Sequence, residues 1–278
     1  MKPLPRLSAA LRDALFPNKC SACGRFFHPP PLPATQPSHA LPVSVELFEK
    51  LMPAFLCRSC IRQFYPVTSP KCKICGEMFP SRAGGGDHTC GACLKQKPHF
   101  NRVRSAGEYD GAFRTLIHAL KYKGKIQLAR PLSRLLFHAF ISYRELEAAE
   151  LIVPTPLHPS RERQRGFNQA ALLLRQWPPL FRQYGGAAPD IAHDRHILKR
   201  VRKTPAQTGL NQRQRMTNIR QAFALQRPAA VEGKNILLID DVCTTGATVD
   251  ECARVLKKGG ANSVNVLTLA RASEKLKR

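Results

Sequence analysis

Residues 236–248 read Ile-Leu-Leu-Ile-Asp-Asp-Val-Cys-Thr-Thr-Gly-Ala-Thr, and this stretch decides the fold. Its four leading apolar residues predict a strand buried on both faces, and a helical pattern over 246–258 follows, ended by two glycines. A helix N-terminus offers free N–H groups and partial positive charge, Gly246 lets the backbone close around an anion, and the threonines add hydroxyl donors. The stretch therefore predicts a phosphate-binding loop between a strand and a helix.

Two adjacent carboxylates, Asp240 and Asp241, precede this loop and would repel a phosphate on their own. They fit there if they face hydrogen-bond donors such as sugar hydroxyls or a hydrated Mg²⁺. A phosphate beside a diol describes a ribose 5-phosphate. The alternative is an ordinary helix cap, which accounts for one residue and leaves the second carboxylate and the threonines unexplained.

The rest of the second half alternates between strand and helix patterns. Strands are predicted at 103–109, 151–153, 235–239 and 263–269, and helices at 111–121, 128–146, 168–184 and 246–258. This alternation is typical of an α/β fold with a parallel sheet flanked by helices, whose loop sites lie at the carboxyl ends of the strands.

The first hundred residues differ in composition. A short helix is expected at 6–15, a proline-rich loop at 28–42, a glycine loop at 83–87 and a linker at 95–101. We therefore divide the chain into an N-terminal module, 1–97, and an α/β domain, 101–278.

Eight of the ten cysteines form four Cys-x-x-Cys pairs in that module: Cys20, Cys23, Cys57, Cys60, Cys72, Cys75, Cys90 and Cys93. Four such pairs supply two closed four-sulfur sites, which predicts two structural zinc ions in a double zinc ribbon. A disulfide framework would require an oxidising compartment, and a redox pair would require a βαβ context. Pairing in sequential order would give two stacked ribbons, and a cross-braced pairing stays open beside it.

Charge is the strongest bulk property, with 44 Lys and Arg against 19 Asp and Glu and a net +25. A hydrophobic fraction of 43% excludes a wholly disordered basic protein, and the charge favours polyanionic partners. No apolar run reaches the ~18 residues of a membrane span and no secretory h-region is visible, so we expect a cytoplasmic protein without a transmembrane segment. Residues 151–220 carry +10 of the charge, which suits either a groove for single-stranded nucleic acid or a solvated basic surface.

Several of these motifs resemble those of known protein families. The 236–248 stretch resembles the motif with which type I phosphoribosyltransferases bind phosphoribosyl pyrophosphate (PRPP). The whole chain is similar to the ComF family of competence proteins, including its GntX-like members. That similarity rests on the four cysteine pairs, on residues 121–124, 153–158, 165–169 and 268–271, and on Arg202, Thr204, Gln207, Thr208, Leu210, Arg215, Asn218 and Phe223.

The resemblance implies a type I phosphoribosyltransferase fold preceded by the zinc module, and it implies roles for single residues. Asp240 and Asp241 would hold the ribose hydroxyls, and the turn after the 151–153 strand, with Pro154, Thr155 and Pro156, would approach the pyrophosphate. A loop over 199–215, with Arg202 and Lys203, would stabilise departing pyrophosphate beside Mg²⁺, which makes these two cations and the two carboxylates the catalytic candidates. The 5-phosphate would be bound by Thr244, Thr245, Gly246, Ala247 and Thr248.

Two functional hypotheses follow from the resemblance. The first is a competence protein that binds PRPP and handles single-stranded DNA together with proteins of the uptake machinery. The second is an active phosphoribosyltransferase of nucleotide and nucleoside metabolism, which displaces pyrophosphate with a nitrogen nucleophile and has no role with DNA. A structural adaptor acting through its zinc module is a third class, and both turnover and the acceptor stay open.

Overall fold

The computed structural model describes residues 17–30, 42–80, 85–184, 191–205 and 212–273. The expected helix at 6–15, most of the proline-rich loop, part of the glycine loop and the middle of the 199–215 loop lie outside these residues. The N-terminal part contains β1 (Asn18–Lys19), β2 (Phe26–Phe27), α2 (Val45–Leu51), α3 (Arg58–Ile61) and α4 (Gly91–Lys95). None of the described helices is long and apolar enough to cross a membrane.

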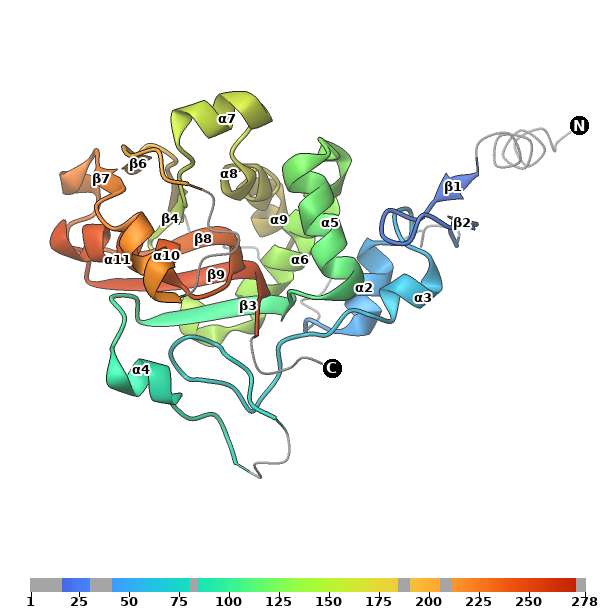
Figure 1. The fold of residues 1–278 in the computed structure, drawn as a ribbon, viewed down its shortest axis with the longest axis horizontal. Helices are drawn as coiled ribbons and strands as arrows, with labels where there is room; N and C mark the ends of the chain where they lie inside the picture. Colours follow the sequence, from blue (N-terminus) through green and yellow to red (C-terminus); the bar gives the residue numbers. More distant parts are fainter. Residues whose placement is uncertain (1–16, 31–41, 81–84, 185–190, 206–211, 274–278) are drawn as a thin grey trace, which may run out of the picture.

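A five-stranded parallel sheet forms the centre of the molecule, as predicted (Figure 1). Its strand order is β3-β9-β8-β4-β5, and all four neighbouring pairs are parallel. The strands are β3 (Arg102–Glu108), β4 (Leu151–Pro154), β5 (Ala192–His193), β8 (Asn235–Cys243) and β9 (Ser263–Arg271). A separate antiparallel pair, called the β6–β7 hairpin below although α10 lies between its strands, consists of β6 (Leu198–Arg200) and β7 (Phe223–Leu225).

Helices cover both faces of the sheet, which explains the unbroken apolar run of β8. Leu237 and Ile239 join the core beneath α5 (Gly111–Tyr122), α6 (Ala129–Ser142), α8 (Gln169–Leu174) and α9 (Trp177–Tyr184). Ile236 and Leu238 join the opposite core with α10 (Gln212–Ile219) and α11 (Ala247–Lys258). Burying each of these side chains contributes about 1.5–3 kcal/mol, so the central strand is held by both layers.

Most predicted elements match the structure to within a few residues, and the differences have local causes. The predicted helix at 168–184 is two helices, because the chain turns at Arg175 and Gln176 and starts α9 just before the two prolines. Strand β8 continues through both carboxylates to Cys243, because β9 pairs with it as far as Arg271. The sequence did not predict the β6–β7 hairpin or α7 (Pro159–Arg165), which have little apolar periodicity.

The cysteine-containing segments pack directly on the α/β domain. Phe48 of α2 stacks on Phe64 with ring centroids 4.1 Å apart, and Phe64 meets Phe113 of α5 edge to face at 5.1 Å. Gly107 of β3 permits this contact, because a Cβ there would lie 2.5 Å from the Phe64 ring. The second segment attaches elsewhere, through a hydrogen bond from Val103 N to Ile74 O of 2.7 Å. The two segments thus contact different parts of the domain and do not stack on each other (Figure 1).

Candidate functional site

The two carboxylates lie within β8 and belong to opposite faces of the sheet. Asp241 continues the side of Leu237 and Ile239, and its Oδ2 atom lies 2.8 Å from Nζ of Lys121 on α5. The Asp240 carboxylate accepts a hydrogen bond of 2.8 Å from the Asp241 backbone N–H. Asp240 is 7% exposed and Asp241 is 4% exposed, so two neighbouring acids and one ammonium group share a nearly dry environment.

Burial decides how these groups ionise. Burial, together with the charge of Asp241, raises the pKa of Asp240 to about 8, against a smaller opposing effect of Lys121. Burial alone would lower the pKa of Lys121, but the ion pair with Asp241 and the charge of Asp240 raise it overall. At neutral pH the cluster therefore holds a charged Lys121 beside an acid pair that retains a proton.

The stretch 244–248, predicted to bind phosphate and called the phosphate loop below, connects a strand to a helix as expected. Gly246 adopts the left-handed region with φ of 82°, which lets the chain turn from β8 into α11 at Ala247. From the other side, Nη1 of Arg215 in α10 donates to Oγ1 of Thr244 at 2.9 Å, so the 199–215 segment reaches the loop. Asp250 in the first turn of α11 accepts a hydrogen bond from the backbone N–H of His99, and its other carboxylate oxygen lies 3.1 Å from Nδ1 of the His99 ring.

Arg271, at the end of β9, forms hydrogen bonds to the backbone at the start of the phosphate loop. Its Nη1 donates to the carbonyl oxygens of Cys243, at 3.1 Å, and of Thr244. Its Nε donates to Cys75 O at 3.0 Å, and its Nη2 pairs with Oε2 of Glu77 at 2.7 Å. One buried guanidinium therefore joins the second cysteine segment to the loop. Neither Arg271 nor Lys121 was predicted as a site residue, because their partners are distant in sequence.

The turn after β4 lies next to the end of β8. Pro154 pairs with Ile239 in the sheet, and Thr155 N donates to Ile239 O at 2.8 Å. Nδ2 of Asn168 holds Thr155 O at 3.0 Å, whereas the buried Thr155 Oγ1 has no hydrogen-bond partner among the described residues. The turn that includes Pro156 thus brings an unused hydroxyl to the edge where the carboxylates lie.

The predicted catalytic cations occupy different environments. Arg202 is exposed and donates to the carbonyl oxygens of Asn218 and Arg220 at 2.8 and 2.7 Å, which ties the ends of its segment together. Lys203 is exposed. Arg200, which was not predicted, is buried; burial lowers its pKa, as does the charge of Arg161. Arg200 donates to Oγ1 of Thr204 at 2.5 Å, and Arg161 donates to the carbonyl oxygen of Thr204 at 2.9 Å.

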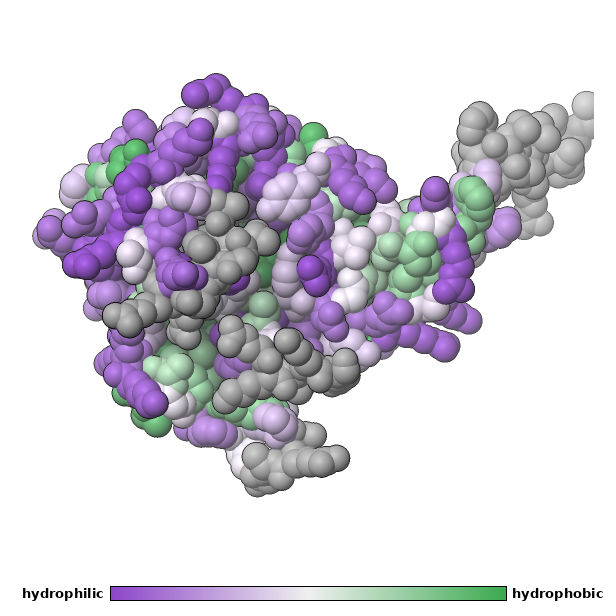
Figure 2. Space-filling view, viewed as in Figure 1, coloured by the Kyte–Doolittle hydropathy of each residue, from purple (hydrophilic) through white to green (hydrophobic). Residues whose placement is uncertain are grey.

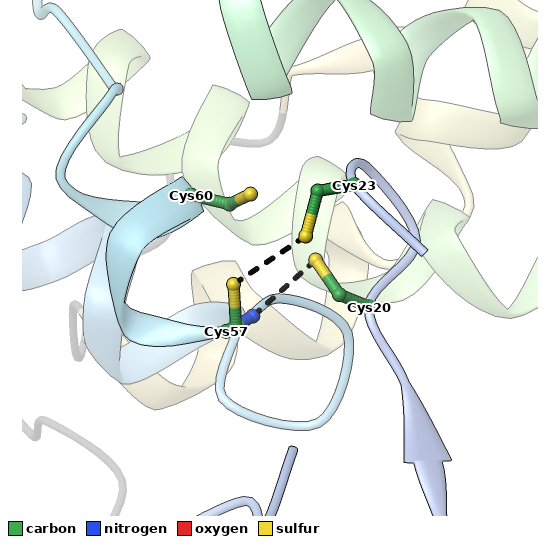
Figure 3. A group of neighbouring side chains, drawn as sticks. All are labelled: Cys20, Cys23, Cys57 and Cys60. Carbon is green, nitrogen blue, oxygen red and sulfur yellow. Dashed lines mark hydrogen bonds between the residues drawn. The ribbon is translucent and has the colours of Figure 1, made fainter. Parts of the chain in front are cut away.

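The first cysteine cluster joins two loops that are far apart in sequence (Figure 3). Cys20 and Cys23 come from the turn between β1 and β2, and Cys57 and Cys60 come from the start of α3. The Sγ atoms of Cys23 and Cys57 are 3.7 Å apart, and Cys57 N donates to Cys20 Sγ at 3.4 Å. A hydrogen bond from Ser59 lowers the pKa of Cys57 to about 6, which favours the thiolate that metals bind.

The second cluster repeats this arrangement with Cys72, Cys75, Cys90 and Cys93. The Sγ atoms of Cys75 and Cys90 are 3.7 Å apart, and two backbone N–H groups, of Cys75 and Cys90, donate to Cys72 Sγ at 3.4 and 3.3 Å. The Cys75 side chain, helped by those N–H groups, lowers the pKa of Cys72 to about 4 against the effect of burial.

Both clusters can hold a zinc ion. Within each group the four sulfur atoms lie within 4.8 Å of one another. Zinc–sulfur bonds of about 2.3 Å in a tetrahedron place sulfur atoms about 3.8 Å apart, which matches the two measured separations of 3.7 Å. Each cluster combines consecutive pairs, so the order is sequential and the cross-braced alternative is wrong. With four sulfurs around each centre, the sites have no open position for catalysis.

Comparisons with known proteins agree with this architecture. The family model of the phosphoribosyl transferase domain matches residues 185–278. Competence protein F of Haemophilus influenzae is 34% identical over 78% of this chain and 90% of its own length. DNA utilization protein YhgH of Salmonella typhi is 36% identical over the same shares. Competence protein ComFC of Bacillus subtilis is 27% identical over 78% of this chain and 84% of its own length.

The part matched by the family model, residues 185–278, includes the strand and loop that hold the carboxylates. The chain therefore belongs to the ComF family of competence proteins and contains a phosphoribosyl transferase domain, as its fold, its two four-cysteine clusters and its identity to competence protein F together show.

Proposed function

We propose that this protein binds PRPP with Mg²⁺ at the carboxyl edge of its sheet and handles single-stranded DNA in the cytoplasm during natural transformation. The observation that carries the PRPP part is the convergence of four different segments on the end of β8. These are the carboxylate pair with Lys121, the threonine loop, the turn at Thr155 and the cation Arg215. The DNA part is supported by relatives named for competence and DNA utilization.

Each segment suits one part of PRPP. The carboxylates of Asp240 and Asp241 would accept hydrogen bonds from the ribose hydroxyls, and the N-terminus of α11 with residues 244–248 would bind the 5-phosphate. The turn at 154–156 would bind pyrophosphate through its backbone, with charge supplied by the arginines around Thr204. Bound Mg²⁺ would add positive charge at the pyrophosphate, and the carboxylates at the strand end are oxygen ligands of the kind it prefers.

Calorimetric titration with PRPP and Mg²⁺ tests the site. The double variant Asp240→Asn, Asp241→Asn should lose binding, because amides bring N–H donors to positions where ribose hydroxyls need acceptors. Glu150→Gln is the matched control: Glu150 is bound by Asn235 at the opposite, amino end of β8, and its variant should bind PRPP normally. Equal affinity of the double variant and the wild type would refute the site.

A second candidate function is catalytic transfer, favoured by the environment of Arg200. This guanidinium is buried and forms no ion pair within the described part of the chain, and it lies near enough to Asp240 for their charges to interact. Such a cation suits the negative charge of departing pyrophosphate. A nitrogen nucleophile would form a bond to the anomeric carbon while the bond from that carbon to pyrophosphate oxygen breaks. Pyrophosphate release, assayed over a panel of nucleobases and amines, should then fall sharply in Arg200→Gln.

Binding of single strands tests the DNA part separately. Binding that neutralises several phosphates weakens steeply with salt, so a labelled oligonucleotide should be retained at ~50 mM salt and released as the salt rises. Figure 2 shows hydrophilic side chains gathered over α7, a surface where a strand would find charge. Failure to bind a single strand at low salt would refute the DNA role and leave the PRPP site untouched.

A further inference from the structure

A row of aromatic rings lies beside the carboxylates, and the proposed PRPP site does not account for it. The row consists of Tyr109, His118 and Tyr122. The ring centroids of Tyr109 and His118 are 6.1 Å apart at an interplanar angle of 30°, and those of His118 and Tyr122 are 5.3 Å apart at 50°. His118 and Tyr122 are four residues apart on α5 and so share one face of that helix.

Two arginines extend the row at its ends. The guanidinium of Arg114 lies 5.9 Å from the centroid of the Tyr109 ring, and that of Arg165, at the end of α7, lies 5.2 Å from the centroid of the Tyr122 ring. Neither arginine forms an ion pair with another described residue, and Arg165 donates to the side-chain oxygen of Gln169. The structure thus places five planar groups in succession and leaves the charges at both ends without a carboxylate in the described ranges.

The row is partly accessible and close to the proposed ribose site. Tyr122 is 67% exposed, whereas Tyr109 and His118 are half-buried and Tyr109 also packs against the core. Lys121, the neighbour of Tyr122 on α5, holds Asp241 at 2.8 Å. Burial raises the pKa of Tyr109 and the nearby charge of Asp241 adds to this effect, so the first ring of the row lies within electrostatic range of the carboxylates.

We propose that this row stacks unpaired bases of single-stranded nucleic acid while Arg114 and Arg165 contact the neighbouring phosphates. The proposal rests on the DNA part of the proposed function and assigns it a surface. Rings suit a single strand because every base has a π-face to stack, and cations suit it because every nucleotide carries a phosphate. A protein partner is disfavoured because it would have to supply several carboxylates to the same small surface.

Fluorescence anisotropy with a labelled 15-nucleotide strand tests the proposal. Tyr122→Ala should weaken binding roughly 5- to 100-fold, the range found for removing one stacked ring, and Tyr122→Phe should retain the affinity. Phe26→Ala is the matched control, because Phe26 is also 67% exposed but lies in β2, outside the row. Arg114→Gln and Arg165→Gln should each reduce the magnitude of the slope of log affinity against log salt concentration by about 0.7, the value per phosphate contact on a single strand.

A strand of the same length with abasic sites separates stacking from charge. If the row stacks bases, wild type and Tyr122→Ala should bind the abasic strand equally. An equal loss on both strands, or no loss in Tyr122→Ala beyond that of Phe26→Ala, would overturn the proposal. A wild type that binds neither strand would overturn the DNA role as a whole, whereas wild-type binding that Tyr122→Ala leaves unchanged overturns only the assignment of this row.

The same rings would also suit a free base, and competition distinguishes the two sources. Free adenine or thymine at millimolar concentration should leave the affinity for the labelled strand unchanged if the row binds a polynucleotide through several contacts. Displacement of the strand by a free base, together with a Tyr122-dependent effect of that base on PRPP binding, would instead identify an acceptor-base site and refute the assignment to a strand.

Discussion

Replacing Arg271 with methionine tests whether the second cysteine segment supports the phosphate loop. Methionine keeps much of the aliphatic stem and removes the guanidinium that joins Cys75 and Glu77 to Cys243 and Thr244. The Arg271 side chain is 6% exposed and that of Glu77 is 15% exposed, so the variant leaves a carboxylate in a nearly buried place with only the Ser273 hydroxyl as a described partner.

The magnitude follows from this burial. Removing one partner of a buried ion pair costs about 3–5 kcal/mol, because the other charge stays desolvated. A double-mutant cycle isolates this cost: adding Glu77→Gln to Arg271→Met removes the stranded charge and should recover about 1–3 kcal/mol of the loss. The free energy of unfolding can be followed by urea denaturation with Trp177, which is fully enclosed by aromatic side chains, as the fluorescent reporter.

Binding gives the second readout. Each lost hydrogen bond to the loop backbone is worth about 1 kcal/mol, or about fivefold in affinity. Arg271→Met loses the bonds to two loop carbonyls, so PRPP should bind roughly 25-fold more weakly at a temperature where the variant is folded. Arg271→Met with an unchanged unfolding midpoint and an unchanged PRPP affinity would refute the reasoning. An unchanged affinity with the expected instability would show that the bridge stabilises the fold alone.

Three further predictions concern single features. Cys20→Ser and Cys72→Ser should each lower the zinc content measured by mass spectrometry from two ions per chain to one, since each removes a sulfur from a different cluster. The unliganded protein should lose stability as the pH rises from about 5 to 8. In this range Asp240 of the folded protein, with its pKa raised to about 8, keeps a proton that the unfolded chain has released. The free energy of unfolding should therefore fall by at most about 1.4 kcal/mol per pH unit. Asp240→Asn should flatten that slope in urea titrations at each pH. Gly246→Ala should destabilise the fold by about 1–2 kcal/mol, because φ is 82° there, and should weaken PRPP binding in calorimetry; a variant as stable as wild type would contradict the strained turn.

The parts of the structure that depend on neighbouring residues could be predicted from the sequence. The β8 strand, the left-handed Gly246 and the start of α11 follow one another in thirteen residues, and each is determined by local chemistry. The Cys-x-x-Cys spacing likewise predicts metal sites without knowledge of the fold. Which pairs share an ion depends on how loops more than thirty residues apart meet, and only the packed structure decides it.

Contacts between distant elements could not be predicted. Lys121 reaches Asp241 because α5 packs over β8. Nothing in the sequence around this lysine indicates that Asp241 is its partner. The sequence also could not show how each cation is used. The guanidinium of Arg202, predicted to stabilise departing pyrophosphate, donates to two backbone carbonyls in the structure. Arg215 donates to Thr244 in the phosphate loop, a contact that the sequence did not indicate.

If PRPP binds as proposed, the net charge of +25 and the buried acid pair would act on it in different ways. Surplus cations attract any polyanion over a distance of about 10 Å at moderate salt, so they raise the encounter rate without discrimination. Asp240 and Asp241 repel a bare phosphate, and with one proton between them they accept a ligand best when it brings hydroxyl donors or a metal ion. Binding such a ligand should therefore release that proton, and its affinity should increase as the pH approaches 8. Discrimination between a ribose phosphate and inorganic phosphate then resides in two carboxylates, in a chain whose charge alone would favour both.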